Sequence, residues 1–303
     1  MLVNFIEDYI NQGLGILREN EPLSKYTTFK VGGAAGALVS PDSKEALVQT
    51  MALIRKHGLS FKVIGKGSNL LPSDEAFDGV VVRLDKGMDY SSLEGEILTA
   101  GAGASTVVLA NQMAKLGFSG LEFISGVPGT LGGAIYMNAG AYNREIKDIL
   151  IKALILDEAG NFLWLTGEEL QFAYRTSILQ QNSCWVVVEA VLQLEAGDHE
   201  EISELMKSRR QRRMESQPLN MPSAGSTFRN PLPHASWYLI QEAGLRGLTV
   251  GGAQVSEKHC NFVVNIGNAT ASDILALIGE VQDAVRKKYG VELHPEVEMF
   301  NWN

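Results

Sequence analysis

Cysteine is nearly absent from this sequence of 303 residues, because Cys184 and Cys260 are the only two. They are far apart and neither belongs to a Cys-x-x-Cys pair, so they support neither a disulfide framework nor a zinc site. The five histidines are also scattered, without the spacing of metal ligands. The sequence therefore predicts no metal.

Long apolar runs and excess positive charge are missing as well. No stretch approaches the roughly 18 to 20 apolar residues of a membrane span, and the segment MLVNFIEDYI at the start carries acids but no basic region of a signal peptide. The formal net charge is -9, whereas nucleic-acid binding needs a basic surface. We therefore expect a cytoplasmic protein without a nucleic-acid or membrane partner. We also expect it to be a monomer.

One basic run departs from this acidic composition. The segment KSRRQRR covers residues 207–213 and lies within a charged helical pattern. The simpler interpretation is a solvated helix face, and the alternative is a contact with a ligand phosphate.

The remaining composition is that of a soluble protein with two or three domains: 45% of the residues are hydrophobic and 20% are charged. A helical stripe begins at residue 3 and ends at Gly13 to Gly15, and further helices are predicted over 43–57 and 271–289. Residues 27–31 and 61–65 look extended. This alternation favours layered helices and strands over a helical bundle.

Glycine is concentrated in the segment GLEFISGVPGTLGGAIYMNAGAYN, residues 120–143, which holds almost no charge. Glycine lets the main chain approach another surface without a Cβ atom in the way. The segment is too apolar for a flexible linker. It predicts main chain pressed against a flat or phosphorylated ligand, and the alternative is a tightly packed turn and helix of the core.

A second glycine-bearing segment, GKGSNLLPSD at residues 65–74, follows a predicted strand. It places free N–H groups, a hydroxyl and an amide together, which suits a pyrophosphate. It matches neither the G-x-G-x-x-G fingerprint nor a Walker loop, and a plain loop is the alternative. Several such turns in one region of helices and strands favour a large nucleotide cofactor.

Polar side chains in the second half of the chain are the candidates for chemistry. Arg175 lies between apolar neighbours and needs a partner, which is either an acid in a structural ion pair or a ligand. Ser226 follows Gly225 in a proline-rich connection and could meet a polar ligand. His259 and Glu296 could each serve a ligand or only the fold.

The ordered motifs resemble one family, UDP-N-acetylenolpyruvoylglucosamine reductase. They are TTFKVGG (27–33), GKGSNLL (65–71), SGVPGTLGGAIYMNAGAY (125–142), YRTS (174–177), PSAGSTFRNP (222–231) and HPEVEMF (294–300). The set spans roughly residues 20 to 300 and is far more specific than any single member. The short YRTS region is similar to the second subtype of the family.

The resemblance implies an α+β fold with a two-lobed FAD-binding domain of the vanillyl-alcohol-oxidase (PCMH) type. Lobe 1 would cover residues 1–85, lobe 2 residues 86–210, and a C-terminal α+β substrate-binding domain residues 211–303. FAD would be noncovalent, because no His or Cys lies in 120–143. The implied cofactor contacts are Gly65, Lys66, Gly67, Ser68, Asn69, Gly126, Pro128, Gly129, Thr130, Gly132, Gly133, Asn138 and Ala139.

The implied reaction is reduction of UDP-N-acetylglucosamine enolpyruvate to UDP-N-acetylmuramate for peptidoglycan, with NADPH as co-substrate. Arg175 and Glu296 match the positions that stabilise charge on the substrate, and Ser226 matches the general acid. The implied substrate contacts are Tyr174, Gln217, Asn230 and His259. His294 and Cys260 depart from the usual family residues, but neither change removes a catalytic group.

Two alternatives stay open from the sequence. An FAD oxidoreductase of the same fold could act on another acid, although it gives no reason for Arg175, Ser226 and Glu296 to occur together. A non-catalytic protein could instead bind a nucleotide sugar without turnover.

Overall fold

The computed structural model describes residues 1–302, which form two compact units. Unit 1 comprises Met1–Asn20, Gly36–Gly65 and Asp78–Arg210. Unit 2 comprises Glu21–Ala35, Lys66–Phe77 and the chain from Gln211 onward. Two short segments from the first half of the chain therefore belong to the same unit as the C-terminal third.

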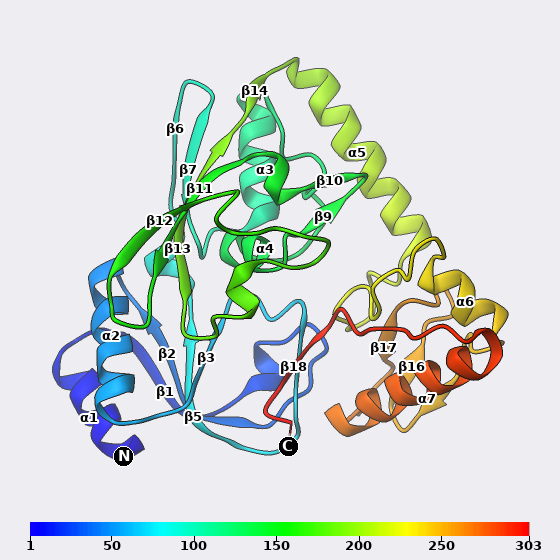
Figure 1. The fold of residues 1–303 in the computed structure, drawn as a ribbon, viewed down its shortest axis with the longest axis horizontal. Helices are drawn as coiled ribbons and strands as arrows, with labels where there is room; N and C mark the ends of the chain where they lie inside the picture. The colour runs from blue at the N-terminus through cyan, green and yellow to red at the C-terminus, as the bar shows by residue number, and fades with distance from the viewer. Residues whose placement is uncertain (303) are drawn as a thin grey trace. The chain divides into compact units, whose positions relative to one another are not determined.

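A four-stranded sheet with the order β1-β2-β5-β3 opens unit 1 (Figure 1). Its strands are β1 (Gly15–Pro22), β2 (Ala34–Pro41), β5 (Phe77–Arg83) and β3 (Phe61–Ile64), and β3 runs parallel to β5. Helices α1 (Leu2–Asn11) and α2 (Lys44–Lys56) pack against each other. The Ser43 hydroxyl caps α2 by accepting a hydrogen bond from Ala46 N at 3.0 Å, and the helix predicted over 43–57 is confirmed.

A five-stranded antiparallel sheet with the order β12-β11-β13-β7-β6 forms the rest of the core of unit 1. Its strands are β12 (Phe162–Thr166), β11 (Leu150–Leu156), β13 (Val186–Gln193), β7 (Ile97–Gly101) and β6 (Ser91–Glu94). Helix α4 (Leu131–Tyr136) packs on β13 and β7, and α3 (Thr106–Lys115) packs near β8. The short strand pairs are β8 (Phe118–Ser119) with β14 (Glu195–Ala196), and β9 (Gly140–Ala141) with β10 (Arg144–Glu145).

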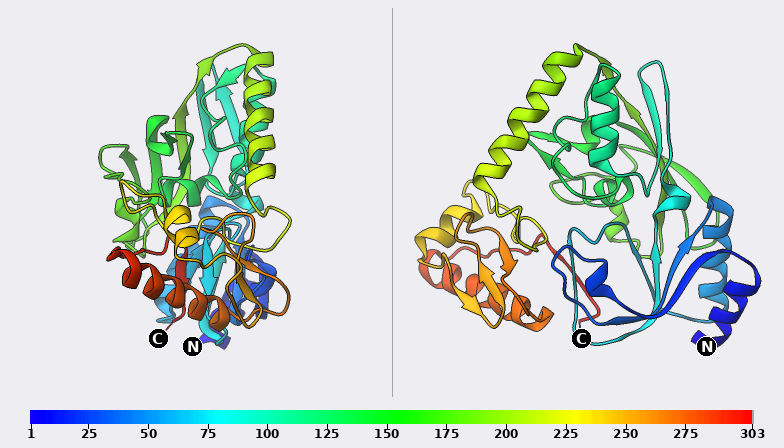
Figure 2. Two further views of the ribbon diagram at one scale, coloured as in Figure 1. Left: turned by 90° about the vertical axis from the view of Figure 1, so that its right-hand side faces the viewer. Right: turned by 180° about the vertical axis from the view of Figure 1, so that it is seen from behind.

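The long helix α5 (His199–Ser216) carries the chain from unit 1 into unit 2 (Figure 2). It contains the basic run. Lys207 pairs with Glu204 at 3.5 Å on an exposed face, whereas the Arg209 guanidinium lies 4.6 Å from the centre of the Tyr142 ring. Part of the run is thus a solvated face and part packs against unit 1 residues.

Unit 2 is built around α7 (Ala271–Tyr289), which packs on a three-stranded sheet and on α6 (Ser236–Glu242) (Figure 2). The sheet has the order β15 (Thr249–Val250), β16 (Ala253–Val255), β17 (Val263–Asn265), and a separate parallel pair joins β4 (Leu70–Pro72) to β18 (Glu298–Phe300). The helix predicted over 271–289 is confirmed. The remaining helical turns, of the 3-10 type, are η1 (Leu23–Lys25), η2 (Lys86–Met88), η3 (Ile146–Asp148) and η4 (Ile178–Gln180).

The mixed content of helices and strands confirms the predicted α+β class, but one local prediction is wrong. Residues 27–31 form a turn instead of an extended segment. The Thr27 hydroxyl donates to Val31 O at 2.8 Å, Lys30 N donates to Thr27 O at 3.2 Å, and Lys30 has a φ of 62°. These local hydrogen bonds replace a strand ladder.

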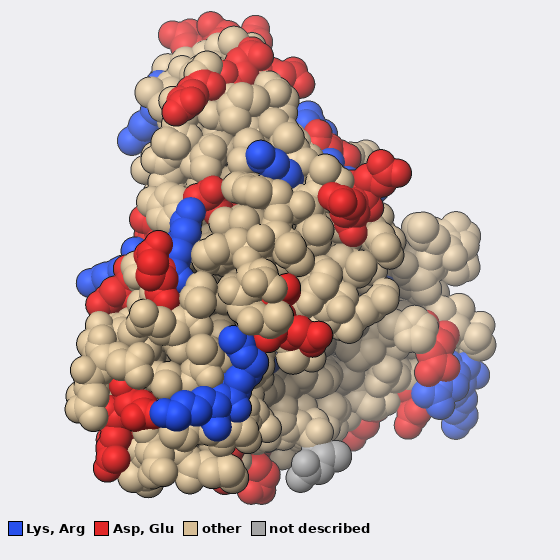
Figure 3. Space-filling view, turned by 60° about the vertical axis from the view of Figure 1, so that its left-hand side comes forward, with Lys and Arg blue, Asp and Glu red and all other residues tan. Residues whose placement is uncertain are grey.

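Between residues 1 and 302, no helix has both the length and the apolar character needed to cross a bilayer. On the face shown in Figure 3, Lys and Arg side chains lie singly or in short rows with acids among them. That face therefore has no continuous positive surface.

Candidate active site

The loop after β3 begins at Gly65, where the main chain touches Thr130. A methyl group at Gly65 would collide with the Thr130 hydroxyl, so only glycine fits there. The same hydroxyl caps α4 by accepting a hydrogen bond from Gly133 N at 3.3 Å. Gly65, the first residue of the predicted cofactor segment 65–69, therefore meets the segment 126–133 inside unit 1.

The rest of this loop packs in unit 2 against the turn around Thr28. Gly67 has a φ of 59°, and a side chain there would collide with the carbonyl of Tyr26. Thr28 N donates to Gly67 O at 3.2 Å. The Thr28 Oγ1 is buried and has no hydrogen-bond partner among the described residues. A buried hydroxyl without a partner, beside a loop that also carries Lys66 and Ser68, fits a polar or phosphorylated group of a cofactor.

The glycine-rich segment holds both packing glycines and accessible ones. Gly132 N donates to Ala102 O at 2.9 Å, and a methyl group at Gly132 would lie 2.9 Å from the Ala102 Cβ. By contrast, Gly133 is exposed, and a methyl group there would come no closer than 3.5 Å to Thr130. The packing interpretation therefore holds for Gly132, while Gly133 leaves main chain within reach of a ligand.

The loop from Gly126 to Gly129, which includes Pro128, is held by the first residue of α3. The Thr106 hydroxyl donates to Val127 O at 2.9 Å, and Thr106 N donates to Gly129 O at 3.3 Å. The loop therefore has a fixed main-chain shape within unit 1.

Asn138 and Ala139 are used inside the protein. Asn138 is fully buried with a φ of 42°, and its Nδ2 donates to Glu145 Oε2 and to Ala173 O, each at 3.0 Å. Ala139 N donates to Ala134 O at 2.8 Å. The donor groups that we predicted for a ligand here are therefore already engaged in holding the turn together.

Arg175 lies at the tip of a tight turn and faces the glycine-rich segment. It has a φ of 56°, and its Nη2 donates to Gly140 O at 2.8 Å. Its Nη1 lies 3.6 Å from Glu145 Oε1, and its guanidinium carbon lies 4.9 Å from the centre of the Tyr174 ring. The ion pair that the sequence left as one alternative is thus present. The ion pair and the bond to Gly140 O fix the direction of the guanidinium. The φ of Arg175 indicates that its main chain is also constrained, because a residue other than glycine rarely adopts such a value.

Ser226 and Glu296 lie on two antiparallel segments of unit 2. Phe228 pairs with Pro295, and Glu296 N donates to Thr227 O at 2.8 Å. Residues that are distant in sequence therefore lie beside each other within one unit. Arg175 belongs to unit 1.

Asn69 connects the loop of residues 65–69 to the segment that carries Glu296. Its Nδ2 donates to Glu296 O at 3.0 Å, and its own carbonyl accepts from Glu298 N at 2.9 Å. Asn69, predicted as a cofactor contact, therefore also determines where the Glu296 main chain lies.

His259 is a half-buried histidine with a defined hydrogen bond. Burial lowers its pKa below the usual value, because water no longer solvates the charged ring, and the positive charge of Arg246 acts in the same direction. Asn261 N donates to His259 Nδ1 at 3.2 Å, and the Phe262 ring centre lies 4.9 Å from that of His259. Because Nδ1 accepts this hydrogen bond, Nε2 is the ring nitrogen that can donate to a ligand.

The other two predicted substrate contacts in unit 2 differ in their surroundings. Asn230 is exposed, and its Oδ1 accepts a hydrogen bond from Ser236 N at 3.0 Å. The Gln217 Oε1 is buried, and no hydrogen-bond donor reaches it among residues 1–302. An acceptor in that position fits a donor supplied by a ligand.

The sequence did not reveal two residues that organise this region. Glu145 binds Arg175, Asn138 and Lys147, and Asn261 bonds to both main-chain groups of Phe228. A signal for Asn261 existed, because an asparagine within the apolar run CNFVV must find hydrogen-bond partners. Glu145 had no such signal, since an acid next to an arginine on a polar turn is common.

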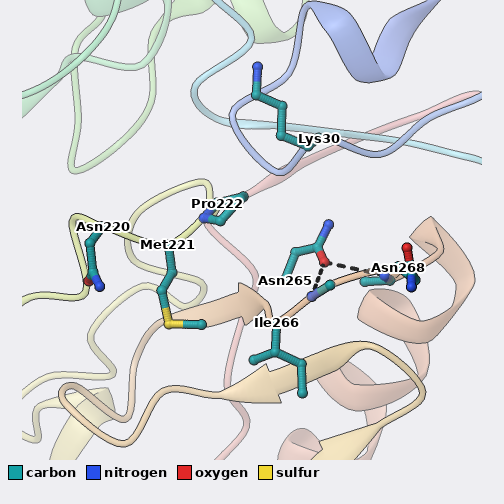
Figure 4. A pocket seen from close by; sticks show the side chains of 9 residues that line it. Lys30, Asn220, Met221, Pro222, Asn265, Ile266 and Asn268 are labelled. Atoms are coloured by element: carbon teal, nitrogen blue, oxygen red, sulfur yellow. Dashed lines mark hydrogen bonds between the residues drawn. The ribbon is translucent and has the colours of Figure 1, made fainter.

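A cavity of 530 Å³ lies elsewhere in unit 2 (Figure 4). Lys30, Asn220, Met221 and Asn265 are among its lining residues. The Asn265 Oδ1 accepts hydrogen bonds from Gly267 N and Ala269 N, so it faces protein groups. None of the predicted site residues lines this cavity.

Comparison with known protein families first defines the class. Residues 35–166 match the family model described as FAD binding domain, and residues 217–300 match UDP-N-acetylenolpyruvoylglucosamine reductase, C-terminal domain. The chain is thus an FAD-binding protein with a reductase-type C-terminal domain. The reductase named UDP-N-acetylenolpyruvoylglucosamine reductase from Bacillus licheniformis is 50% identical over 286 residues, covering 94% of each chain. That from Bacillus subtilis is 48% identical over 298 residues, covering 98% of each.

Solved structures agree with this assignment. The crystal structure of UDP-N-acetylenolpyruvylglucosamine reductase (MurB) from Thermus caldophilus has a TM-score of 0.82 and 36% identity, and it covers 94% of this chain and 100% of that chain. The berberine bridge enzyme from Eschscholzia californica shares the fold alone, with a TM-score of 0.50, 15% identity and coverage of 64% and 44%. This chain belongs to the UDP-N-acetylenolpyruvoylglucosamine reductase family, which confirms the resemblance found in the sequence.

Proposed function

We propose that this protein is an FAD-dependent reductase that uses NADPH to convert UDP-N-acetylglucosamine enolpyruvate into UDP-N-acetylmuramate, for peptidoglycan synthesis. The observation that carries the proposal is the identity of 48% to a reductase of that name over 98% of both chains. We also propose that it works as a cytoplasmic monomer, without a nucleic-acid or membrane partner.

The cofactor fits the loops already described. When bound, FAD supplies a route by which a hydride passes from NADPH to the substrate double bond. In unit 1, Gly65 and the exposed main chain at Gly133 would contact it, and in unit 2, residues 66–69 and the partnerless hydroxyl of Thr28 would contact it. Binding would be noncovalent, because residues 120–143 offer no His or Cys. We assign residues 1–85 and 86–210 to the two cofactor-binding lobes and residues 211–303 to substrate binding.

Three side chains would act on the substrate. Hydride addition to the methylene carbon moves the electron pair of the double bond onto the neighbouring carbon and its carboxylate. The Arg175 guanidinium and the Glu296 carboxyl group stabilise that charge. Ser226 donates its hydroxyl proton to the carbanionic carbon and regains a proton from water. In total one hydride and one proton are added, and NADPH becomes NADP+.

The remaining contacts would orient the nucleotide sugar. His259 offers its Nε2 as a donor, and Gln217 offers a buried acceptor, which suits a substrate rich in hydroxyl and carbonyl groups. Tyr174 and Asn230 are exposed and complete the set.

The test uses the visible spectrum of the purified protein. We expect a yellow protein whose flavin absorbance is bleached by NADPH without oxygen and returns when UDP-N-acetylglucosamine enolpyruvate is added. A colourless protein that FAD cannot reconstitute would contradict the proposal. Bleaching without recovery would favour a different substrate on the same fold, and absence of NADPH consumption would favour a binding protein.

A further inference from the structure

Asn261 is a buried residue whose side-chain amide hydrogen-bonds to both main-chain groups of one neighbouring residue. Only 4% of Asn261 is exposed. Its Oδ1 accepts a hydrogen bond from Phe228 N at 3.0 Å, and its Nδ2 donates to Phe228 O at 2.8 Å. One side chain therefore satisfies both main-chain groups of Phe228, as a partner strand would.

The main chain on both sides of Asn261 extends this attachment to Thr227. Thr227 N donates to Asn261 O at 2.8 Å, and Val263 N donates to the Thr227 hydroxyl at 3.0 Å. The Thr227 carbonyl accepts from Glu296 N at 2.8 Å. Thr227 and Phe228 are 0% and 2% exposed, so water cannot replace these partners.

These contacts place a fixed main-chain segment directly after Ser226. Ser226 precedes Thr227, and the segment that carries Glu296 hydrogen-bonds to Thr227 on its other side. We propose that Asn261 is a positioning residue for protonation of the substrate: it sets the register of residues 226–228, and through Thr227 it aligns Ser226 with Glu296. This inference rests on the proposed function and extends it to a residue that does not touch the substrate.

The first test compares two buried asparagines. Asn261→Ala removes both bonds to Phe228. Asn265→Ala is the matched control, because Asn265 is also buried and bonds to Phe29 O, Gly267 N and Ala269 N through its side chain, away from residues 226–228. We expect Asn261→Ala to slow the return of flavin absorbance with the enolpyruvyl sugar by roughly 10- to 100-fold, as a misplaced catalytic group does. Bleaching by NADPH should change by less than about twofold, and Asn265→Ala should not show this separation.

A second variant gives an answer if Asn261→Ala does not fold. In Asn261→Asp one oxygen still accepts from Phe228 N, while the other faces Phe228 O and can bond to it only when protonated. Its rate of flavin recovery should therefore rise as pH falls from 8 to 6, relative to the wild type, and His259 is present in both proteins. Hydrogen exchange of the Phe228 amide in the FAD-free protein is an independent measurement, and it should be faster in Asn261→Ala than in the wild type.

The outcomes separate this inference from the proposed function. If wild-type flavin absorbance does not return with the enolpyruvyl sugar, the proposed function fails, and Phe228 exchange still reports on the attachment. If the wild type works but Asn261→Ala recovers at the wild-type rate, or slows both half-reactions to the same extent, the positioning role is overturned. An Asn261→Asp variant with the pH profile of the wild type would overturn it as well.

Discussion

The side-chain amide of Asn69 donates a hydrogen bond to the main-chain carbonyl of Glu296 at 3.0 Å, across 227 positions of sequence. In return, Asn69 O accepts from Glu298 N at 2.9 Å, next to the parallel pairing of β4 with β18. A loop assigned to the cofactor and a strand assigned to the substrate are therefore held together. A change in the conformation of the loop that carries Asn69 should therefore alter the position of the Glu296 segment, and the reverse.

We expect Asn69→Ala to weaken FAD binding and to slow turnover. The lost hydrogen bond corresponds to about 1 kcal/mol, or roughly fivefold in an equilibrium constant. Flavin fluorescence titration gives the FAD dissociation constant, and steady-state assays at saturating FAD give kcat. If kcat is unchanged once FAD is saturating, Asn69 acts on the cofactor alone and not on Glu296.

Gly67→Ala should destabilise the protein more than Gly95→Ala. Both glycines have a φ near 60°, so each alanine pays about 1 kcal/mol for the left-handed conformation. Only at Gly67 would the new side chain also collide with Tyr26, since nothing lies within 4 Å at Gly95. Urea unfolding and FAD retention on gel filtration measure the difference. Equal midpoints for the two variants would rule out the close approach as the reason for Gly67.

Ser226→Ala should separate the two half-reactions. Bleaching of the flavin by NADPH needs no proton from Ser226 and should stay within about twofold of the wild type. Recovery with the enolpyruvyl sugar should slow by about 10²- to 10⁴-fold, the usual contribution of a general acid. Stopped-flow absorbance follows both steps, with Ser223→Ala as the control from the same segment. An undiminished recovery rate would remove the proton-donor role.

Arg175→Lys tests whether the guanidinium serves the substrate or only the fold. Lysine keeps the charge but loses the planar geometry that contacts both Gly140 and Glu145. We expect kcat to fall by about 10- to 100-fold with a smaller change in KM. Glu145→Gln removes the acid but keeps an acceptor for Asn138. If both variants lose stability alike and keep the wild-type kcat, the ion pair is purely structural.

His259 should make stability depend on pH in a specific direction. Its pKa is lowered in the folded state by burial, so the unfolded chain takes up the proton first as pH falls. The free energy of unfolding should therefore decrease as pH falls below the unfolded-state pKa of about 6.5. The decrease should end once the pH is below the folded-state pKa. Urea unfolding of the wild type and His259→Gln between pH 8 and 5 isolates this contribution. Parallel curves would show that His259 titrates alike in both states.

Helix α7 shows what the sequence could predict. Its apolar period, the Thr270 and Asp273 capping box and the left-handed Gly290 with a φ of 66° are all local signals, and the helix has the predicted ends. The glycine loops were likewise visible, because glycine permits left-handed main-chain conformations and close approach to a neighbour.

The contacts of the candidate site residues could not be predicted from local sequence, because they depend on the tertiary structure. The turn at Lys30 depends on hydrogen bonds that compete with an extended chain, and Arg175 finds Glu145 only when β9 and β10 form their hairpin. Gly132, one of the glycines predicted to face the cofactor, packs closely against Ala102. The glycines predicted that the main chain approaches another group closely, but only the fold showed which group that is.

The pairing of β4 with β18 has a consequence for synthesis on the ribosome. β4 leaves the ribosome long before β18 is made, so the cofactor loop has no partner strand for most of translation. Contacts this far apart in sequence form late in folding. A nascent or truncated chain without β18 should therefore fail to retain FAD, and the bound flavin becomes a reporter of complete synthesis.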